Sequence, residues 1–276
     1  MPFLKMVRML FLFAGAPKGI PALQMSFAID CQYKTAFVNL QKLRQAMSTE
    51  REGIRLSDDI EIDAAWFGGK IRQENMKEDR VDRRKLKKKK GSKERCIMVL
   101  RERRKTGRTI AFAADGETQA VAIGAARTLI NYYFPAIFYT DGAHAYDDLE
   151  AFGILRAGDH KRGFSVDGIS SNRAESFFSR IRRGEYGSYH HLGQVWLDFY
   201  AGEMTWRENH RRMPNKTAMQ WLLTAALAHP ISRVLKGYWQ HWEVPDRELE
   251  RKEVRWRRVF SRVWERGLPD RVQFAT

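Results

Sequence analysis

Apolar residues recur along the chain in two rhythms, one typical of helices and one typical of strands. Residues 33–47 repeat an apolar residue every three or four positions, which predicts a helix whose buried face carries Phe37, Leu40, Leu43 and Met47. A shorter helix over 21–29 and a polar turn at 30–32 precede it. Residues 1–16 hold two basic residues before an apolar run. They fit a first helix, and a secretory signal is the alternative.

The rhythm changes after residue 58. Ile60 and Ile62 alternate with Glu61 and Asp63, which predicts a strand that carries Asp63 on the face opposite the isoleucines, with Glu61 and Ala65. Further strands are expected over 96–103, 109–115 and 136–142, and helices over 118–130, 171–183 and 192–212. Either Ser171 or Asn172 is a natural cap for the helix over 171–183. Strands that alternate with helices in this way indicate an α/β layered fold.

Charge adds a second constraint. Among 276 residues, 49 Lys and Arg face 33 Asp and Glu, a net charge of +16 and a pI near 10.0. Such a surplus indicates a polyanionic partner, usually nucleic acid, with an anionic membrane surface as the alternative. No apolar run is long enough to span a membrane, so no membrane association is expected.

Most of the surplus lies between residues 70 and 108, and it is densest in 83–95, which include Lys87, Lys88, Lys89 and Lys90. A run of this kind is typical of a solvated loop, and it also suits contacts with a phosphate backbone.

The two helices over 21–29 and 33–47, joined by a short turn, are typical of a helix-turn-helix. Polar and basic residues on the other faces of the second helix are candidates for DNA contacts: Lys34, Thr35, Asn39, Lys42 and Arg44. A small helical bundle with a solvated basic face is the alternative.

Three carboxylates are candidates for chemistry. Asp63 lies within a strand, Asp141 follows the apolar run of another, and Glu175 falls in the first turn of a helix, where the helix dipole favours its charge. Carboxylate oxygens suit Mg²⁺, and a pair of such ions can activate a nucleophile and stabilise a leaving oxygen at a phosphodiester. Spacing alone makes this a weak signal.

The two cysteines, Cys31 and Cys96, are far apart in sequence. They predict no zinc site from this chain and a reducing, cytoplasmic compartment.

Four blocks occur in the order "EIDAAWFGGK", "FYTDGAHAYDDL", "SNRAESFFSRIRRGEYGSYHHL" and "FYAGEMTWRENHRR". Together with the upstream helix-turn-helix pattern, they resemble the DDE transposases of bacterial insertion sequences, in the ISXO2-like branch. The resemblance covers roughly residues 17–215. It implies an α/β fold with an RNase H-like mixed sheet flanked by helices and preceded by a helix-turn-helix. The expected division is 1–50 for the helix-turn-helix region, 57–215 for the catalytic domain with a basic insertion at 70–108, and 216–276 for a C-terminal helical appendage.

The resemblance also implies site residues and partners. Asp63, Asp141 and Glu175 would be the catalytic acids and the ligands of two Mg²⁺ or Mn²⁺ ions. Arg182 stands where the family often has a lysine seven residues after the glutamate, and His160 matches a family position. Asn172 would either assist at the site or cap the helix. The expected partner is double-stranded DNA, at element ends and target, bound by a homo-oligomer in a bacterial, nucleoid-associated setting.

Two departures keep alternatives open. Members of the branch usually carry a cysteine-rich zinc ribbon before the helix-turn-helix, and an acid often follows the first catalytic aspartate where this chain has Ala64. The expected activity is DNA cleavage followed by strand transfer. The alternatives are an inactive or truncated relic that only binds DNA, and a metal-dependent nuclease without strand transfer.

Overall fold

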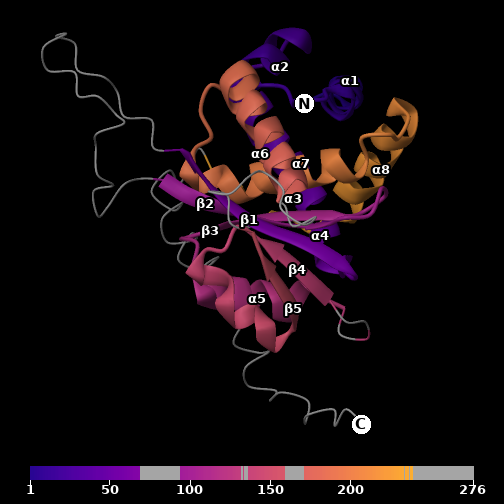
Figure 1. Cartoon of the computed structure of the whole chain (residues 1–276). Coiled ribbons are helices and arrows are strands. Elements are labelled where there is room, and N and C mark those ends of the chain that lie inside the picture. The colour runs from indigo at the N-terminus through magenta and orange to yellow at the C-terminus, as the bar shows by residue number, and fades with distance from the viewer. Residues whose placement is uncertain are drawn as a thin grey trace, which may run out of the picture.

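The fold is known from a computed structural model (Figure 1), which describes residues 1–68, 94–131, 133, 136–158, 171–232, 234–235 and 237–238. Three of the sequence predictions lie wholly or partly outside these residues: the lysine run at 87–90, His160, and the part of the C-terminal helical appendage after residue 238.

The predicted alternation of strands and helices is present. The helices are α1 (Phe3–Gly15), α2 (Ala22–Ala28), α3 (Tyr33–Ser48), α4 (Glu50–Gly53), α5 (Gln119–Leu129), α6 (Asn172–Gly184), α7 (Leu197–Asn209) and α8 (Asn215–Ala228). Short 3₁₀ and π segments are η2 (His144–Ala151), η3 (Glu185–Tyr189) and η4 (Gln194–Trp196). The strands are β1 (Asp59–Gly68), β2 (Glu94–Glu102), β3 (Thr109–Ala114), β4 (Ala136–Thr140) and β5 (Gly153–Ala157).

The five strands form one mixed sheet in the order β3-β2-β1-β4-β5. β1 runs antiparallel to β2 and parallel to β4, and β4 runs parallel to β5. The edge strand β5 was not predicted, because it has only five residues and its two large apolar side chains, Ile154 and Leu155, are adjacent in sequence rather than alternating with polar ones. The sheet with helices on both faces confirms the RNase H-like α/β fold.

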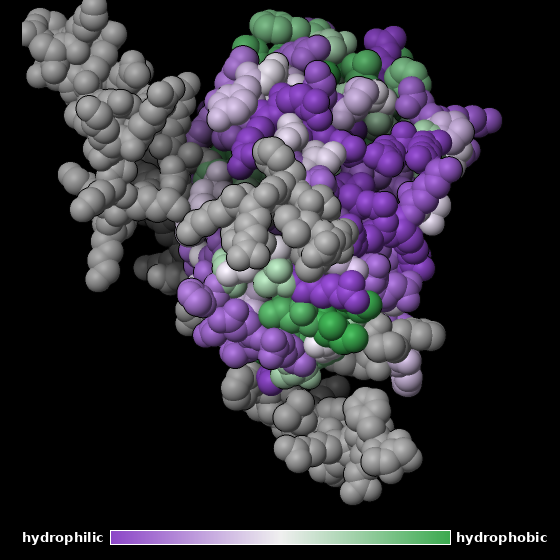
Figure 2. Space-filling model, viewed as in Figure 1, coloured by the Kyte–Doolittle hydropathy of each residue, from purple (hydrophilic) through white to green (hydrophobic). Residues whose placement is uncertain are grey.

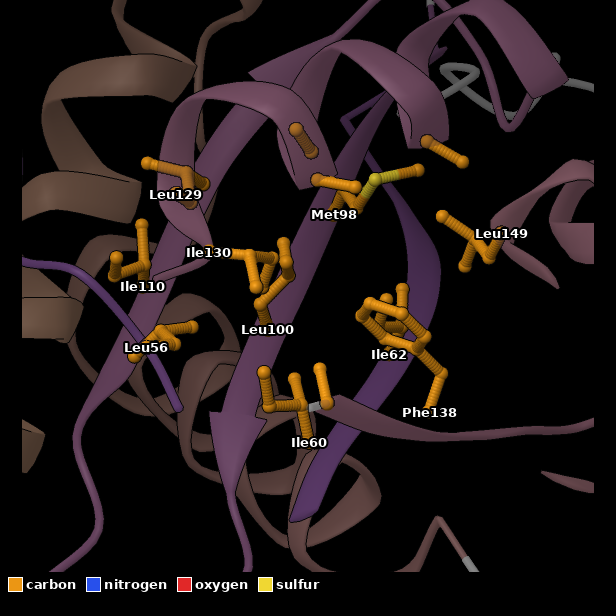
Figure 3. Close-up of a cluster of buried hydrophobic side chains, with 14 of the residues drawn as sticks. Leu56, Ile60, Ile62, Met98, Leu100, Ile110, Leu129, Ile130, Phe138 and Leu149 are labelled. Carbon is orange, nitrogen blue, oxygen red and sulfur yellow. The ribbon is translucent and has the colours of Figure 1, made fainter. Parts of the chain in front are cut away.

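Each face of the sheet has its own core. On one side Ile60 and Ile62 of β1 pack with β2, β4, η2 and α5 (Figure 3). On the other side Ala65 and Phe67 pack with β2, α6 and α7. The predicted alternation in β1 is therefore confirmed, and it turns Glu61, Asp63 and Ala65 toward the side of α6.

Helix α7 packs against both the sheet and the N-terminal helix α3. Its side chains satisfy the open backbone of the edge strand β3: Asn209, Thr205 and Asp198 accept the N–H groups of Thr109, Ala111 and Ala113 at 2.8, 2.9 and 3.1 Å. Covering an edge strand in this way prevents it from pairing with another chain.

Helices α1, α2 and α3 form a third core with α8 and the end of α7. The close approach of α3 to α7 depends on Gly202, because a Cβ there would overlap Ser48 Oγ. The N-terminal helices thus pack directly on α7, which contacts the sheet (Figure 1), and α8, predicted as part of the C-terminal appendage, packs with α1.

Hydrophilic side chains cover most of the surface visible in Figure 2, and apolar ones gather at its top, where α1 and α2 lie. Phe3 and Phe27, both 78% exposed, belong to these two helices. Within the described ranges, no helix is long and apolar enough to cross a membrane.

Candidate active site

Two of the three predicted acids lie side by side on the central strands. β1 and β4 run parallel, and Glu61 pairs with Tyr139. Continued two residues further, this register brings Asp63, within β1, beside Asp141, the residue that follows the end of β4 at Thr140. Neighbouring strands lie about 4.8 Å apart, so the two carboxylates share one end of the sheet.

The chain turns sharply just after Asp141. Gly142 has a φ of +78°, a conformation that suits glycine. The carboxylate Oδ1 of Asp141 accepts the N–H of Ala143 at 3.1 Å, which forms a tight turn after the strand. This turn fixes the direction of the Asp141 side chain, which is partly exposed.

Glu175 is placed by a helix cap that comes from β1. The buried carboxylate of Glu61 accepts the backbone N–H groups of Arg173 and Ala174 at 2.8 and 3.0 Å, in the first turn of α6. A carboxylate at this end of a helix satisfies N–H groups that have no partner within the helix. Because Glu61 lies two residues before Asp63 on the same face of β1, the cap positions Glu175 relative to Asp63.

This arrangement corrects the sequence prediction of a local cap. Ser171 does occupy the N-cap position of α6, but its side chain makes no capping hydrogen bond, and Asn172 is the first residue of the helix and is exposed. The cap residue lies more than a hundred positions earlier in the chain, beyond the reach of a local motif.

The electrostatics of Asp63 show that the acids form one group. Burial raises the pKa of Asp63 to about 7, its hydrogen bond from the N–H of Ala64 opposes this, and the charges of Asp141, Glu117 and Glu175 raise the pKa further. The charges of the other two predicted acids therefore both act on Asp63. Glu117 is a fourth member that the sequence did not single out, because it lies in a polar link between a strand and a helix.

The carboxylates of Asp63 and Asp141 suit a divalent cation whose remaining ligands come from water and substrate. Among the described residues, no three acidic, histidine or cysteine side chains stand close enough to hold a metal ion together. Mg²⁺ in phosphate chemistry commonly takes only one or two protein carboxylates and completes its shell with water and substrate phosphate. The level pair Asp63 and Asp141 fits that requirement.

The two predicted supporting residues that the structure describes, Arg182 and Asn172, both belong to α6. Arg182 is exposed on α6, with its guanidinium carbon 5.9 Å from the ring centre of Phe67, a residue on the same face of β1 as Asp63. It therefore stands on the side of β1 that carries the acids. Exposed Asn172 stands three residues before Glu175.

Four of the five residues predicted in the helix-turn-helix remain accessible on α3. Lys34 and Lys42 are exposed, while Thr35 and Asn39 are partly exposed. Asn39 also donates its side-chain N–H to the carbonyl of Thr35 at 2.8 Å.

The prediction for Arg44 is wrong. Its side chain is 2% exposed, and its Nε donates to Glu203 Oε2 at 2.6 Å, so it faces α7 and not DNA. The cause is the packing of α3 on α7, which turns this polar position inward. A single basic residue in a helix does not indicate on which side of the molecule it will lie.

A cluster of arginines gathers where α6, α7 and β2 meet. Arg101, Arg180 and Arg211 all pair with the carboxylate of Glu208, Arg101 at 2.7 Å and Arg211 at 3.3 Å. Burial and then the charge of Arg211 lower the pKa of Arg101 to about 10. Three cations around one anion leave a local positive surplus, which we call the Glu208 arginine cluster.

Comparisons with known proteins place this geometry in a family. A search of curated proteins and a search of solved structures each returned no match. The family model of the ISXO2-like transposase domain matches residues 55–209, a span that holds the whole sheet, α6 and α7. Because this match covers more than half of the chain, the protein belongs to the ISXO2-like transposase family.

Proposed function

We propose that the protein is a metal-dependent DDE transposase that cleaves DNA at the ends of an insertion sequence and joins them to a target. The observation that carries this is the acidic centre: Asp63 lies within β1, Asp141 directly follows the neighbouring parallel strand β4, and the charges of Asp141 and Glu175 both act on Asp63. A group of like charges of this kind is unfavourable until a cation joins it.

The roles follow from the positions. Asp63 and Asp141 would hold divalent ions, Mg²⁺ or Mn²⁺, with Glu175 completing the set from α6. Bound there, two such ions would lower the pKa of an attacking water and neutralise charge on the leaving oxygen. Hydrolysis would free a 3′-OH at the element end. That 3′-OH would then attack the phosphorus of a target phosphodiester bond, form a new P–O bond and displace the target's 3′ oxygen as the leaving group.

DNA would be held by cations outside the acidic centre. Arg182 stands on the same side of β1 as Asp63 and suits a phosphate close to the reacting bond. The exposed Lys34 and Lys42 of α3 and the Glu208 arginine cluster would hold backbone phosphates further away. We expect the active form to be a homo-oligomer on double-stranded DNA.

The test is an assay with Mg²⁺, linear element-end DNA and target plasmid. Asp63→Asn, Asp141→Asn and Glu175→Gln should each lower cleavage and strand transfer by about 100-fold or more, because each removes a charged ligand of the divalent ions that would stabilise the transition state. Binding of the same DNA in EDTA should persist. The matched control is Asp148→Asn, which changes an exposed carboxylate of η2 and should leave both steps intact.

The outcomes separate the alternatives. Cleavage without joining would indicate a nuclease that lacks strand transfer, and binding without cleavage would indicate a DNA-binding relic. Full activity in any one of the three variants would remove that residue from the site.

A further inference from the structure

A buried tyrosine hydroxyl and a partly exposed carboxylate form a hydrogen-bonded pair beside the acidic centre. The hydroxyl of Tyr146 donates to Glu117 Oε1 at 2.8 Å, and the Tyr146 side chain is only 1% exposed. The two residues come from different elements: Tyr146 from η2, which follows β4, and Glu117 from the link between β3 and α5. The pair therefore joins the segment after β4 to the segment after β3. These two strands lie on opposite sides of β1 in the sheet.

Tyr146 is connected directly to the turn that carries Asp141. Ala143 donates its N–H to Asp141 Oδ1 at 3.1 Å, and its carbonyl accepts the N–H of Tyr146 at 3.0 Å. A displacement of the Tyr146 backbone would thus be passed to the Asp141 turn through a single residue. The hydrogen bond to Glu117 restrains the other end of the same tyrosine.

Packing alone does not require this hydrogen bond. The ring of Tyr146 lies in the core on the α5 side of the sheet, where a phenylalanine would fill the same space. A buried hydroxyl is costly unless it is bonded, and its acceptor here is a carboxylate already within the field of Asp63 and Asp141. The arrangement adds a like charge to the centre and holds it in one orientation.

We propose that Tyr146 and Glu117 form a positioning pair that fixes the Asp141 turn and keeps the Glu117 carboxylate directed at the acidic centre. The inference rests on the proposed function, since it concerns the same site. The two residues act through Asp141, and neither is assigned contact with the reacting phosphate.

The first measurement is metal binding without DNA. Mg²⁺ and Mn²⁺ are titrated into the full chain, and affinity is read from calorimetry and from the rise in the thermal unfolding midpoint. Tyr146→Phe and Glu117→Gln should each weaken binding by about 10-fold, in the range found when groups that orient metal ligands are removed. The double variant should be no weaker than the weaker single one, because the two residues act as one unit.

The second measurement is the Mg²⁺ concentration that gives half-maximal cleavage, which should rise in parallel in the same variants. The matched controls are Tyr133→Phe, a tyrosine that is 94% exposed, and Glu150→Gln, an exposed residue of η2. Both should match the parent chain. Should Tyr146→Phe fail to fold, Glu117→Gln and Glu117→Asp carry the test.

Failure of the inference differs from failure of the proposed function. If the parent chain binds Mg²⁺ and cleaves DNA while the variants keep their metal affinity, the positioning role is wrong and the function stands. Losses that simply add in the double variant would also overturn the pair. A parent chain that neither binds metal nor cleaves DNA would overturn the proposed function itself.

Discussion

Two groups of charged side chains with limited exposure to solvent lie in this molecule, and they are built in opposite ways. One joins α3, α7 and η3: Glu203 accepts from Arg44 at 2.6 Å, from Arg207 at 2.8 Å and from the hydroxyl of Tyr189 at 2.9 Å. The other is the acidic centre of Asp63, Asp141, Glu117 and Glu175, in which the coupled charges have one sign.

Their pKa shifts run in opposite directions. Burial alone would raise the pKa of Glu203, but Arg44 and Arg207 bring it below its ordinary value. The pKa of Asp63 rises to about 7, because burial and neighbouring acids act together. A charged group matched within the chain is a structural link, whereas a group of like charges is complete only with a ligand of opposite sign.

The largest effect on stability is expected in the group around Glu203, where the charges are matched within the chain. Glu203→Gln would leave Arg44 and Arg207 buried without their counter-charge, and the free energy of unfolding should fall by about 3–5 kcal/mol. Urea denaturation measures this loss, and Glu52→Gln, at an exposed position of α4, is the control. A loss below about 1 kcal/mol would show that the cluster is not the link described here.

At the acidic centre the expected effect is a dependence of stability on pH. The folded chain holds a proton on Asp63 up to about pH 7, whereas the unfolded chain releases it near the ordinary pKa of 3.8. The folded state therefore binds more protons between these values, and its stability should decline as pH rises from about 4 to 7 and then level off.

Asp63→Asn should remove that decline. Denaturation in EDTA at pH 5 and pH 8 should show the variant gaining stability relative to the parent chain at the higher pH. Equal differences at both pH values would mean that folding does not raise the pKa of Asp63 as described.

The smallest effect concerns the Glu208 arginine cluster, where the charges are only partly matched. If Arg180 contacts a DNA phosphate, Arg180→Gln should reduce the slope of log affinity against log salt concentration by about 0.9. Lys216→Gln, which removes one exposed charge from α8, should leave the slope unchanged. An unchanged slope in Arg180→Gln would make this cluster structural, like the one around Glu203.

The sequence predicted the elements that follow a clear local period. The alternation in β1 placed Asp63 opposite Ile60 and Ile62, and the helical spacing in α3 placed Leu40 and Met47 in a core, as the structure has them. It missed β5, a five-residue strand in which the adjacent Ile154 and Leu155 give no alternation of apolar and polar residues. It also took the helix over 192–212 as one element, although a 3₁₀ turn precedes α7.

The sequence indicated only some residues of the candidate site, because the others carry no local pattern. Asp63, Asp141 and Glu175 carry a motif in the chain, and the structure couples them. Glu61, which caps α6, and Glu117, which binds Tyr146, carry no local signal, because each is defined by a partner far along the chain. Arg44 was placed on the wrong side of its helix for the same reason, since Glu203 lies on a helix 159 residues away.

The sequence by itself determined the periods of the elements and the charge surplus, because these depend on local composition, and its resemblance to a known family indicated the three acids. The tertiary structure decided which charges meet. It brought Asp63 level with Asp141 through strand pairing, and it turned Arg44 inward by packing α3 on α7. Both outcomes arise from contacts between distant segments, where burial and electrostatics act on the whole fold and not on any one stretch of the chain.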